Sequence, residues 1–169
     1  MPKAIRNYVK YVDAVNRVVG LFAMYLVFAM IGVLLYSSIS KTFFLPALWT
    51  LEMAQFIMVA YYLLGGGYSM QLGAHVRMDL MYDRWSEKTK GKVDSVTSLF
   101  MIFFLVILLY GGISSTLYAL EYGETSRSIW SPKMAPIKIV MDIGILLTLM
   151  QAIAIFFKSL ATATGKDIT

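Results

Sequence analysis

The sequence contains no cysteine and a single histidine among its 169 residues. Without thiols the chain can form neither disulfides nor iron–sulfur clusters, and one imidazole cannot supply the axial pair common in membrane haem proteins. Charged residues are also scarce, because they make up 15% of the chain compared with about 25% in soluble domains. We therefore expect an integral membrane protein without a metal, haem or other cofactor.

Hydrophobic residues make up 59% of the sequence and gather in four long runs, at about residues 18–39, 49–72, 94–120 and 137–159. A helix needs about 20 mainly apolar residues to cross the hydrocarbon core of a bilayer, so each run is predicted to be one transmembrane helix. The first run is longer than the apolar region of a signal peptide, and we expect it to stay as an anchor. The predicted fold class is an all-α integral membrane protein, with residues 1–169 forming a single four-helix membrane domain.

Lysine and arginine are unevenly distributed between the segments that connect these runs. Eleven of the 15 lie in the N-terminal tail, in the loop after the second run or at the C-terminal end, and four lie in the other two connections. Because positive residues favour the cytoplasmic side, both termini are expected to be cytoplasmic. No basic face on a soluble module is visible, so a nucleic-acid partner is not expected.

Two segments outside the apolar runs are predicted to be interfacial helices. The N-terminal tail, about residues 3–17, has apolar side chains at helical spacing and basic side chains opposite them, as in helices that lie on an anionic inner leaflet. The segment of about residues 79–90 places Met81, Tyr82 and Trp85 on one face of a short helix. The alternative is an ordinary solvated tail and loop.

Small residues recur four apart in three of the runs, where they would let another helix backbone approach closely. A compact helical bundle is expected, although glycine, alanine, serine and threonine are also common in membrane helices by chance. The three sets are Gly65, Ser69 and Gly73; Gly111, Ser115 and Ala119; and Gly144, Thr148 and Ala152.

Apart from Asp94, Lys138 and Lys158 at the ends of the runs, the predicted spans contain only two charged residues, Glu52 and Asp142. Charges within a membrane are costly, so both are candidates for function. Glu52 follows Trp49, a natural interface anchor, and Asp142 lies four residues after Lys138, the spacing of a helical ion pair. The simplest interpretation makes both carboxylates interface groups paired with cations. For Glu52 the available cations are Lys41, Arg127, Lys133 and Lys138.

The only histidine, His75, lies beside Arg77 and Asp79 in the loop after the second run. General acid–base chemistry by His75 is possible, but no nucleophile has a supporting motif and no phosphate-binding loop is present. A structural interpretation is simpler. Asp79 could cap the following helix, Arg77 could bind a carboxylate or a lipid phosphate, and His75 would lie at the C-terminal end of the second span.

The order of these motifs resembles a known family. Trp49-Thr-Leu-Glu52 opens the second run and Gly73-Ala-His75-Val-Arg77-Met-Asp79 follows it. This arrangement is similar to the small, DctQ-type membrane subunit of the tripartite ATP-independent periplasmic (TRAP) transporters. The loop 126–130 and the segment 146–151 look similar too, so the resemblance covers about residues 49–151.

The resemblance implies a non-catalytic subunit of the bacterial cytoplasmic membrane. Such a subunit would form a heterodimer with a large, multi-span TRAP subunit, to which a periplasmic binding protein delivers substrate. A sodium gradient would drive uptake of an organic acid, and the small subunit would extend the static scaffold of an elevator-type transporter. It would bind neither substrate nor sodium.

Within this family, Glu52 and Trp49 would fix the outer end of the second span, and Arg77 and Asp79 the cytoplasmic turn, with a membrane phospholipid as a possible ligand. The exposed loop around Arg127 and Trp130 would contact the large subunit or the docked binding protein. Two other functions stay open on the residues themselves. One is a small self-assembling exporter that couples to protons through Glu52, and the other is a membrane enzyme that uses the histidine cluster.

Overall fold

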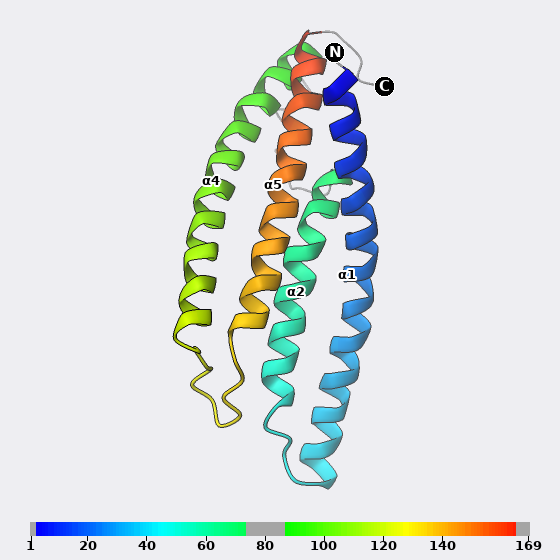
Figure 1. Ribbon diagram of the computed structural model, residues 1–169. Coiled ribbons are helices and arrows are strands. Elements are labelled where there is room, and N and C mark those ends of the chain that lie inside the picture. The colour runs from blue at the N-terminus through cyan, green and yellow to red at the C-terminus, as the bar shows by residue number, and fades with distance from the viewer. Residues whose placement is uncertain (1–2, 74–86, 165–169) are drawn as a thin grey trace.

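The computed structural model describes residues 3–73 and 87–164, which form four long helices lying side by side (Figure 1). They are α1 (Lys3–Phe43), α2 (Thr50–Gln71), α4 (Glu87–Glu121) and α5 (Ala135–Thr164). Both termini lie at one end, which we call the terminal end, and the loops 44–49 and 122–134 lie at the other, the loop end. No β-strand occurs in the described ranges, so the all-α prediction is confirmed.

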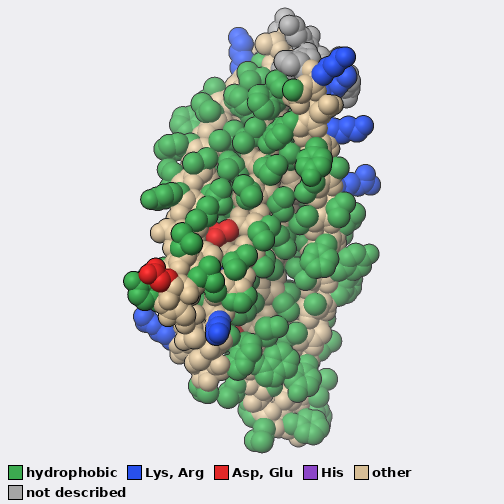
Figure 2. Space-filling view, in the orientation of Figure 1, with side chains coloured by type: hydrophobic (Ala, Val, Ile, Leu, Met, Phe, Trp, Pro, Cys, Tyr) green, Lys and Arg blue, Asp and Glu red, His purple; other side chains and the backbone are tan. Residues whose placement is uncertain are grey.

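The helices are arranged in the order α4, α5, α2, α1 (Figure 1), with extensive contacts between each neighbouring pair. α1 also reaches α5. One apolar core joins α2, α4 and α5 through Met70, Leu105 and Ile145, and a second joins α1 to α5 through Val12 and Ala154. The outward faces stay apolar, and Figure 2 shows hydrophobic side chains over the middle of one face, with lysine and arginine near the terminal end and others toward the loop end.

Three of the helices described here are long and apolar enough to cross a membrane: α1, α4 from Thr89 onward, and α5. α2 has the length for a span, with 22 residues, but it is not among them. Its sequence contains Gln55, two adjacent tyrosines and the run Gly65–Gly67, which lower its hydropathy. Four helices are thus confirmed, while the fourth span stays a prediction.

The N-terminal segment differs from the expectation. No helix boundary occurs near residue 17, because Lys3–Phe43 is a single helix of 41 residues, roughly 60 Å long at 1.5 Å per residue. A separate interfacial helix over residues 3–17 is therefore wrong. The physical reason is tertiary, since Val9 and Val12 pack against Ala154 of α5 and leave no apolar face for a lipid surface.

The second expected interfacial helix, at residues 79–90, lies mostly outside the described residues. Its last four positions, 87–90, are the first turn of α4.

Glycines decide how closely the helices approach, at positions that only partly match the predicted small-residue sets. A side-chain carbon at Gly144 of α5 would lie 2.8 Å from the Leu63 backbone of α2, so this contact requires glycine. On α2 the close contacts come from Gly66 and Gly67, whereas at Gly65 the nearest atom is 4.0 Å away. The closest contacts of α2 within this bundle therefore lie one or two residues from Gly65, and each residue rotates a helix by about 100°.

Candidate functional site

Four polar residues link α1 to α5 near the terminal end, and we call Asp13, Asn16, Gln151 and Lys158 the terminal polar chain. The Lys158 ammonium donates to Oδ2 of Asp13 at 2.7 Å, and Nε2 of Gln151 donates to Oδ1 of the same carboxylate at 2.9 Å. Nδ2 of Asn16 then donates to Oε1 of Gln151 at 2.8 Å. Asn16 and Gln151 are fully buried, and their polar atoms are bound within the terminal polar chain except Oδ1 of Asn16, which has no partner.

The terminal polar chain was not predicted from the sequence, although the sequence contains a pattern that indicates it. The buried row of α1 follows helical spacing through Val9, Val12, Asn16, Gly20 and Ala23, so Asn16 interrupts an apolar face. A polar residue in such a row needs a buried hydrogen-bond partner. The partner comes from a helix more than 130 positions away in the sequence, and spacing alone could not identify it.

Glu52 lies in the first turn of α2 at the loop end. Its Oε1 accepts a hydrogen bond of 2.8 Å from the Ser126 hydroxyl, and its Oε2 is buried without a partner. None of the four cations proposed from the sequence pairs with it among the described residues, so the predicted ion pair is wrong. A neutral hydroxyl from the α4–α5 loop takes that place.

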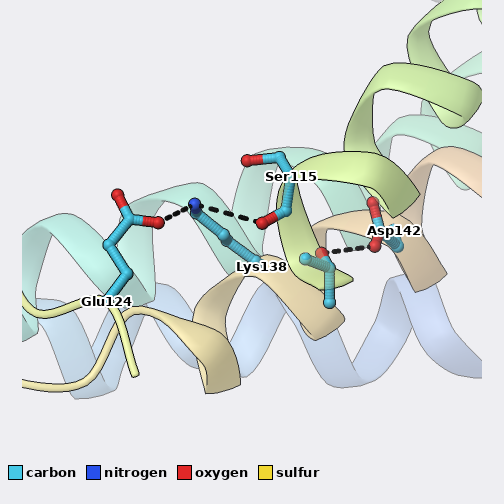
Figure 3. Close-up of polar contacts among 5 residues, drawn as sticks. Ser115, Glu124, Lys138 and Asp142 are labelled. Carbon is cyan, nitrogen blue, oxygen red and sulfur yellow. Dashed lines mark hydrogen bonds and ion pairs between the residues drawn. The ribbon is translucent and has the colours of Figure 1, made fainter. Parts of the chain in front are cut away.

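The predicted pair of Lys138 with Asp142 is also wrong, as Figure 3 shows. The Lys138 ammonium forms an ion pair with Glu124 and donates to the backbone oxygen of Ser115 at 3.4 Å. Asp142 instead accepts a hydrogen bond of 2.6 Å from the Thr116 hydroxyl of α4, and its Oδ1 is buried without a partner. The spacing allowed the pair, but α4 packs over Asp142 while Lys138 reaches the loop.

Trp49 lies where the α1–α2 turn meets α2, and its ring stacks on Tyr36 with centroids 5.7 Å apart. Buried hydroxyls hold the same turn. The Thr50 hydroxyl donates to the backbone oxygen of Ala47 at 2.8 Å and accepts from the Ser37 hydroxyl of α1, whose oxygen lies 2.9 Å away. The loop end of α2 is therefore fixed through Trp49 and Thr50 as well as through its glutamate.

The α4–α5 loop is a small irregular hairpin. Thr125 and Lys133 form an isolated antiparallel bridge, and the Ser126 amide donates to the Pro132 oxygen at 2.9 Å. This pairing holds the Ser126 hydroxyl against α2. Arg127 and Trp130 are exposed on the same loop, so their predicted contact with another protein stays a prediction.

His75, Arg77 and Asp79 lie outside the described residues, and the roles predicted for them stay predictions. Within residues 3–73 and 87–164, no group of three or more histidine, aspartate or glutamate side chains could hold a metal ion.

Residues 30–162 match the family described as tripartite ATP-independent periplasmic transporters, DctQ component. The chain belongs to the DctQ family. The resemblance drawn from Trp49, Glu52 and the histidine motif is thereby confirmed. In this DctQ chain the match contains the loop-end carboxylates Glu52 and Asp142, whereas Asp13 lies before it. None of the curated proteins is similar enough to match the chain.

Proposed function

We propose that this DctQ chain is the non-catalytic small subunit of a sodium-coupled, binding-protein-dependent transporter that takes up an organic acid. Its role is to extend and stabilise the static scaffold of the large subunit during elevator-type transport. Family membership over residues 30–162 carries the proposal, since it makes the chain one component of a tripartite transporter.

The internal contacts support a static role. The terminal polar chain joins α1 to α5 at one end, and the bond between Ser126 and Glu52 joins the α4–α5 loop to α2 at the other. Gly144 lets the α5 and α2 backbones touch between them. Helices that are tied at both ends and close-packed in between resist sliding, which is what a scaffold requires.

The proposal includes four membrane spans in the bacterial cytoplasmic membrane with both termini in the cytoplasm. Two observations support this orientation: both termini lie at one end of the four helices (Figure 1), and lysine and arginine predominate in the segments expected on that side. Arg77 and Asp79 would then pin the cytoplasmic turn, with a phospholipid headgroup as ligand.

Neither acidic residue of the spans supports a substrate or coupling role. Glu52 lies in the first turn of α2, and Asp142 lies in the second turn of α5, so both are near the loop end. Each accepts a hydrogen bond from a hydroxyl of this same chain. We therefore assign both carboxylates to architecture.

Reconstitution tests the proposal directly. The chain, its large membrane subunit and its periplasmic binding protein together should take up an organic acid into proteoliposomes under a sodium gradient. The chain alone should show no uptake, and Glu52→Gln should keep uptake close to that of the wild type. Uptake by the chain alone, or loss of uptake with normal assembly in Glu52→Gln, would contradict the scaffold role.

The cytoplasmic turn has its own test. Substitution of both Arg77 and Asp79 by alanine should lower the yield of the two-subunit complex on gel filtration more than it lowers substrate affinity. An unchanged yield would remove the role assigned to this turn.

A further inference from the structure

One face of α2 is exposed from the loop end to Tyr62 and only partly covered at Gly65 and Ser69. Its residues follow alternating steps of four and three, the 3.5-residue period with which one helix packs along another. Leu51 and Met58 are about half exposed, at 54% and 46%, and Tyr62 is 60% exposed. We call this face the α2 stripe, and its residues are Leu51, Gln55, Met58, Tyr62, Gly65 and Ser69.

The α2 stripe is poorly suited to lipid. Gln55 is exposed and its amide makes no hydrogen bond with any described residue, whereas hydrocarbon offers no partner to an amide. α2 is also the one described helix that does not reach the hydropathy of a membrane span. A helix with this composition needs protein on its open side, because polar side chains in membranes hydrogen-bond across helix interfaces.

A groove of about 540 Å³ lies beside the α2 stripe, between α1 and α2. Small residues of both helices line it, among them Gly20, Ala23 and Gly65, and Tyr62 also borders it. A side chain at Gly65 would meet only the Ala23 methyl, at 4.0 Å, so the fold of this chain does not require glycine there. Since glycine inside a helix is destabilising by about 0.5–1 kcal/mol relative to alanine, approach of an outside backbone explains it better.

The exposed face of α4 differs from the α2 stripe in its composition. It presents large apolar side chains such as Phe100, Phe103 and Phe104 on a helix that has the hydropathy of a membrane span. Such a face is satisfied by lipid alone. The difference between the two faces selects α2 as the surface that a protein covers.

We propose that the groove between α1 and α2 docks one transmembrane helix of the large transporter subunit. The helix runs along the α2 stripe, approaches closely at Gly65, and supplies a hydrogen-bonding group to Gln55. This inference rests on the proposed function, which provides the large subunit as the partner.

The absence of cysteine makes a crosslinking test clean, because any introduced thiol is the only one in this chain. Tyr62→Cys places a thiol on the α2 stripe, and Ile113→Cys places its control on the exposed face of α4. The two positions lie at similar depth, since their neighbours Leu63 and Gly112 contact Gly144 and Asp142, two residues apart on α5. Each variant is co-expressed with the large subunit, labelled with a benzophenone maleimide and irradiated in membranes.

The expected result is an adduct between this chain and the large subunit from Tyr62→Cys but not from Ile113→Cys. An adduct from Ile113→Cys alone, or no protein adduct from either variant, overturns the proposal. An adduct of twice the mass of this chain from Tyr62→Cys also overturns it, because it identifies a second copy as the occupant. Co-purification of the large subunit with unlabelled wild-type chain separates these results from failure of the proposed function, which would abolish co-purification altogether.

A paired substitution gives a second measurement. Gly65→Leu should lower the amount of co-purified large subunit by about tenfold, which corresponds to about 1.4 kcal/mol of binding free energy. Gly111→Leu on α4, where an added side chain meets nothing within 4 Å, should leave that amount unchanged. Equal effects of the two substitutions, or a loss from Gly111→Leu alone, would overturn the assignment to α2.

Discussion

Asp13 at the terminal end and Asp142 near the loop end are both partly buried carboxylates that connect two helices, but their oxygens are satisfied differently. Both oxygens of Asp13 are bound, one by the Gln151 amide and one by the Lys158 ammonium. Asp142 has one hydroxyl donor, from Thr116, and its second oxygen is buried without a partner. Glu52 repeats the pattern of Asp142 with Ser126 as its donor.

This difference indicates that the stability of the fold depends on specific polar contacts more at the terminal end than at the loop end. At the terminal end, removal of Asp13, Asn16 or Gln151 takes a partner from a fully buried side chain on the other helix, and an unpaired buried polar group costs its full desolvation. At the loop end each carboxylate is already incompletely satisfied, so loss of its charge removes little.

The largest effect is expected from Gln151→Leu, which takes the main partner from Asn16, leaving it a 3.4 Å contact with the Leu147 oxygen, and one of two partners from Asp13. The free energy of unfolding of the purified chain should fall by about 3 kcal/mol, from about 1–3 kcal/mol for each stranded group. Denaturant titration in detergent, followed by circular dichroism, measures it. Gln55→Leu makes the same chemical change at an exposed position and should stay within about 0.5 kcal/mol of the wild type. Equal losses of stability in the two variants would show that burial of Gln151 in the terminal polar chain does not cause the effect.

A smaller difference is expected between Gly67→Ala and Gly112→Ala, each of which points a methyl group at a partly free side-chain oxygen. The new carbon at position 67 would lie 2.9 Å from Cγ of Asn16, which its hydrogen bond to Gln151 holds in place. At position 112 the corresponding distance to Cγ of Asp142 is 3.5 Å, so mainly the terminal Oδ1 of that carboxylate must shift. We expect Gly67→Ala to lose about 2 kcal/mol, as for overpacked cores. Gly112→Ala should lose clearly less in the same titration.

Neutralising Asp13 should lower the stability of the fold, whereas neutralising Asp142 should not. Asp13→Asn leaves Lys158 without its carboxylate and should lower stability by about 1 kcal/mol, a value discounted because both side chains are partly exposed. Asp142→Asn keeps an acceptor for Thr116 and removes a charge with one unpartnered oxygen, so stability should be unchanged or higher. Thermal unfolding of the two variants side by side measures the difference, and a larger loss for Asp142→Asn would reverse the ranking of the two ends.

The smallest effect is expected for Lys138→Gln, which removes the ion pair with Glu124. Part of this pair is open to solvent, since the Glu124 side chain is 38% exposed. Pairs of this kind contribute about 0–1 kcal/mol. The loss of stability should shrink further at high salt. A salt-independent loss of more than about 1 kcal/mol would contradict this prediction, because it would mean that the pair of Lys138 with Glu124 is stronger than a surface ion pair.

Much of the fold follows from hydropathy alone. The predicted runs 49–72 and 137–159 lie close to α2 and α5, and residues 94–120 fall inside α4. The error at residues 3–17 has a definite cause. A stripe of Val9 and Val12 looks the same in sequence whether it faces lipid headgroups or another helix. In the structure it faces a helix, because α5 packs against it.

The candidate site was less predictable, because partners in a helical bundle come from distant segments. The i,i+4 spacing suggested Asp142 for Lys138, yet Glu124 on the neighbouring loop is the partner. Glu52 was identified from its motif, but Ser126 could not be found as its donor before the α4–α5 hairpin was known. Spacing describes one helix at a time and gives no information about what lies opposite.

The sequence by itself determined the class of the protein, its four helices and its family, since apolar runs and the order of Trp49, Glu52 and the histidine motif are properties of the chain in one dimension. Only the tertiary structure decided that residue 17 is no helix boundary, which carboxylate is fully satisfied, and which glycine admits a neighbour. Those outcomes depend on the rotation of each helix about its axis. A shift of one residue turns a helix by about 100°, so packing of the whole bundle selects the contact that forms.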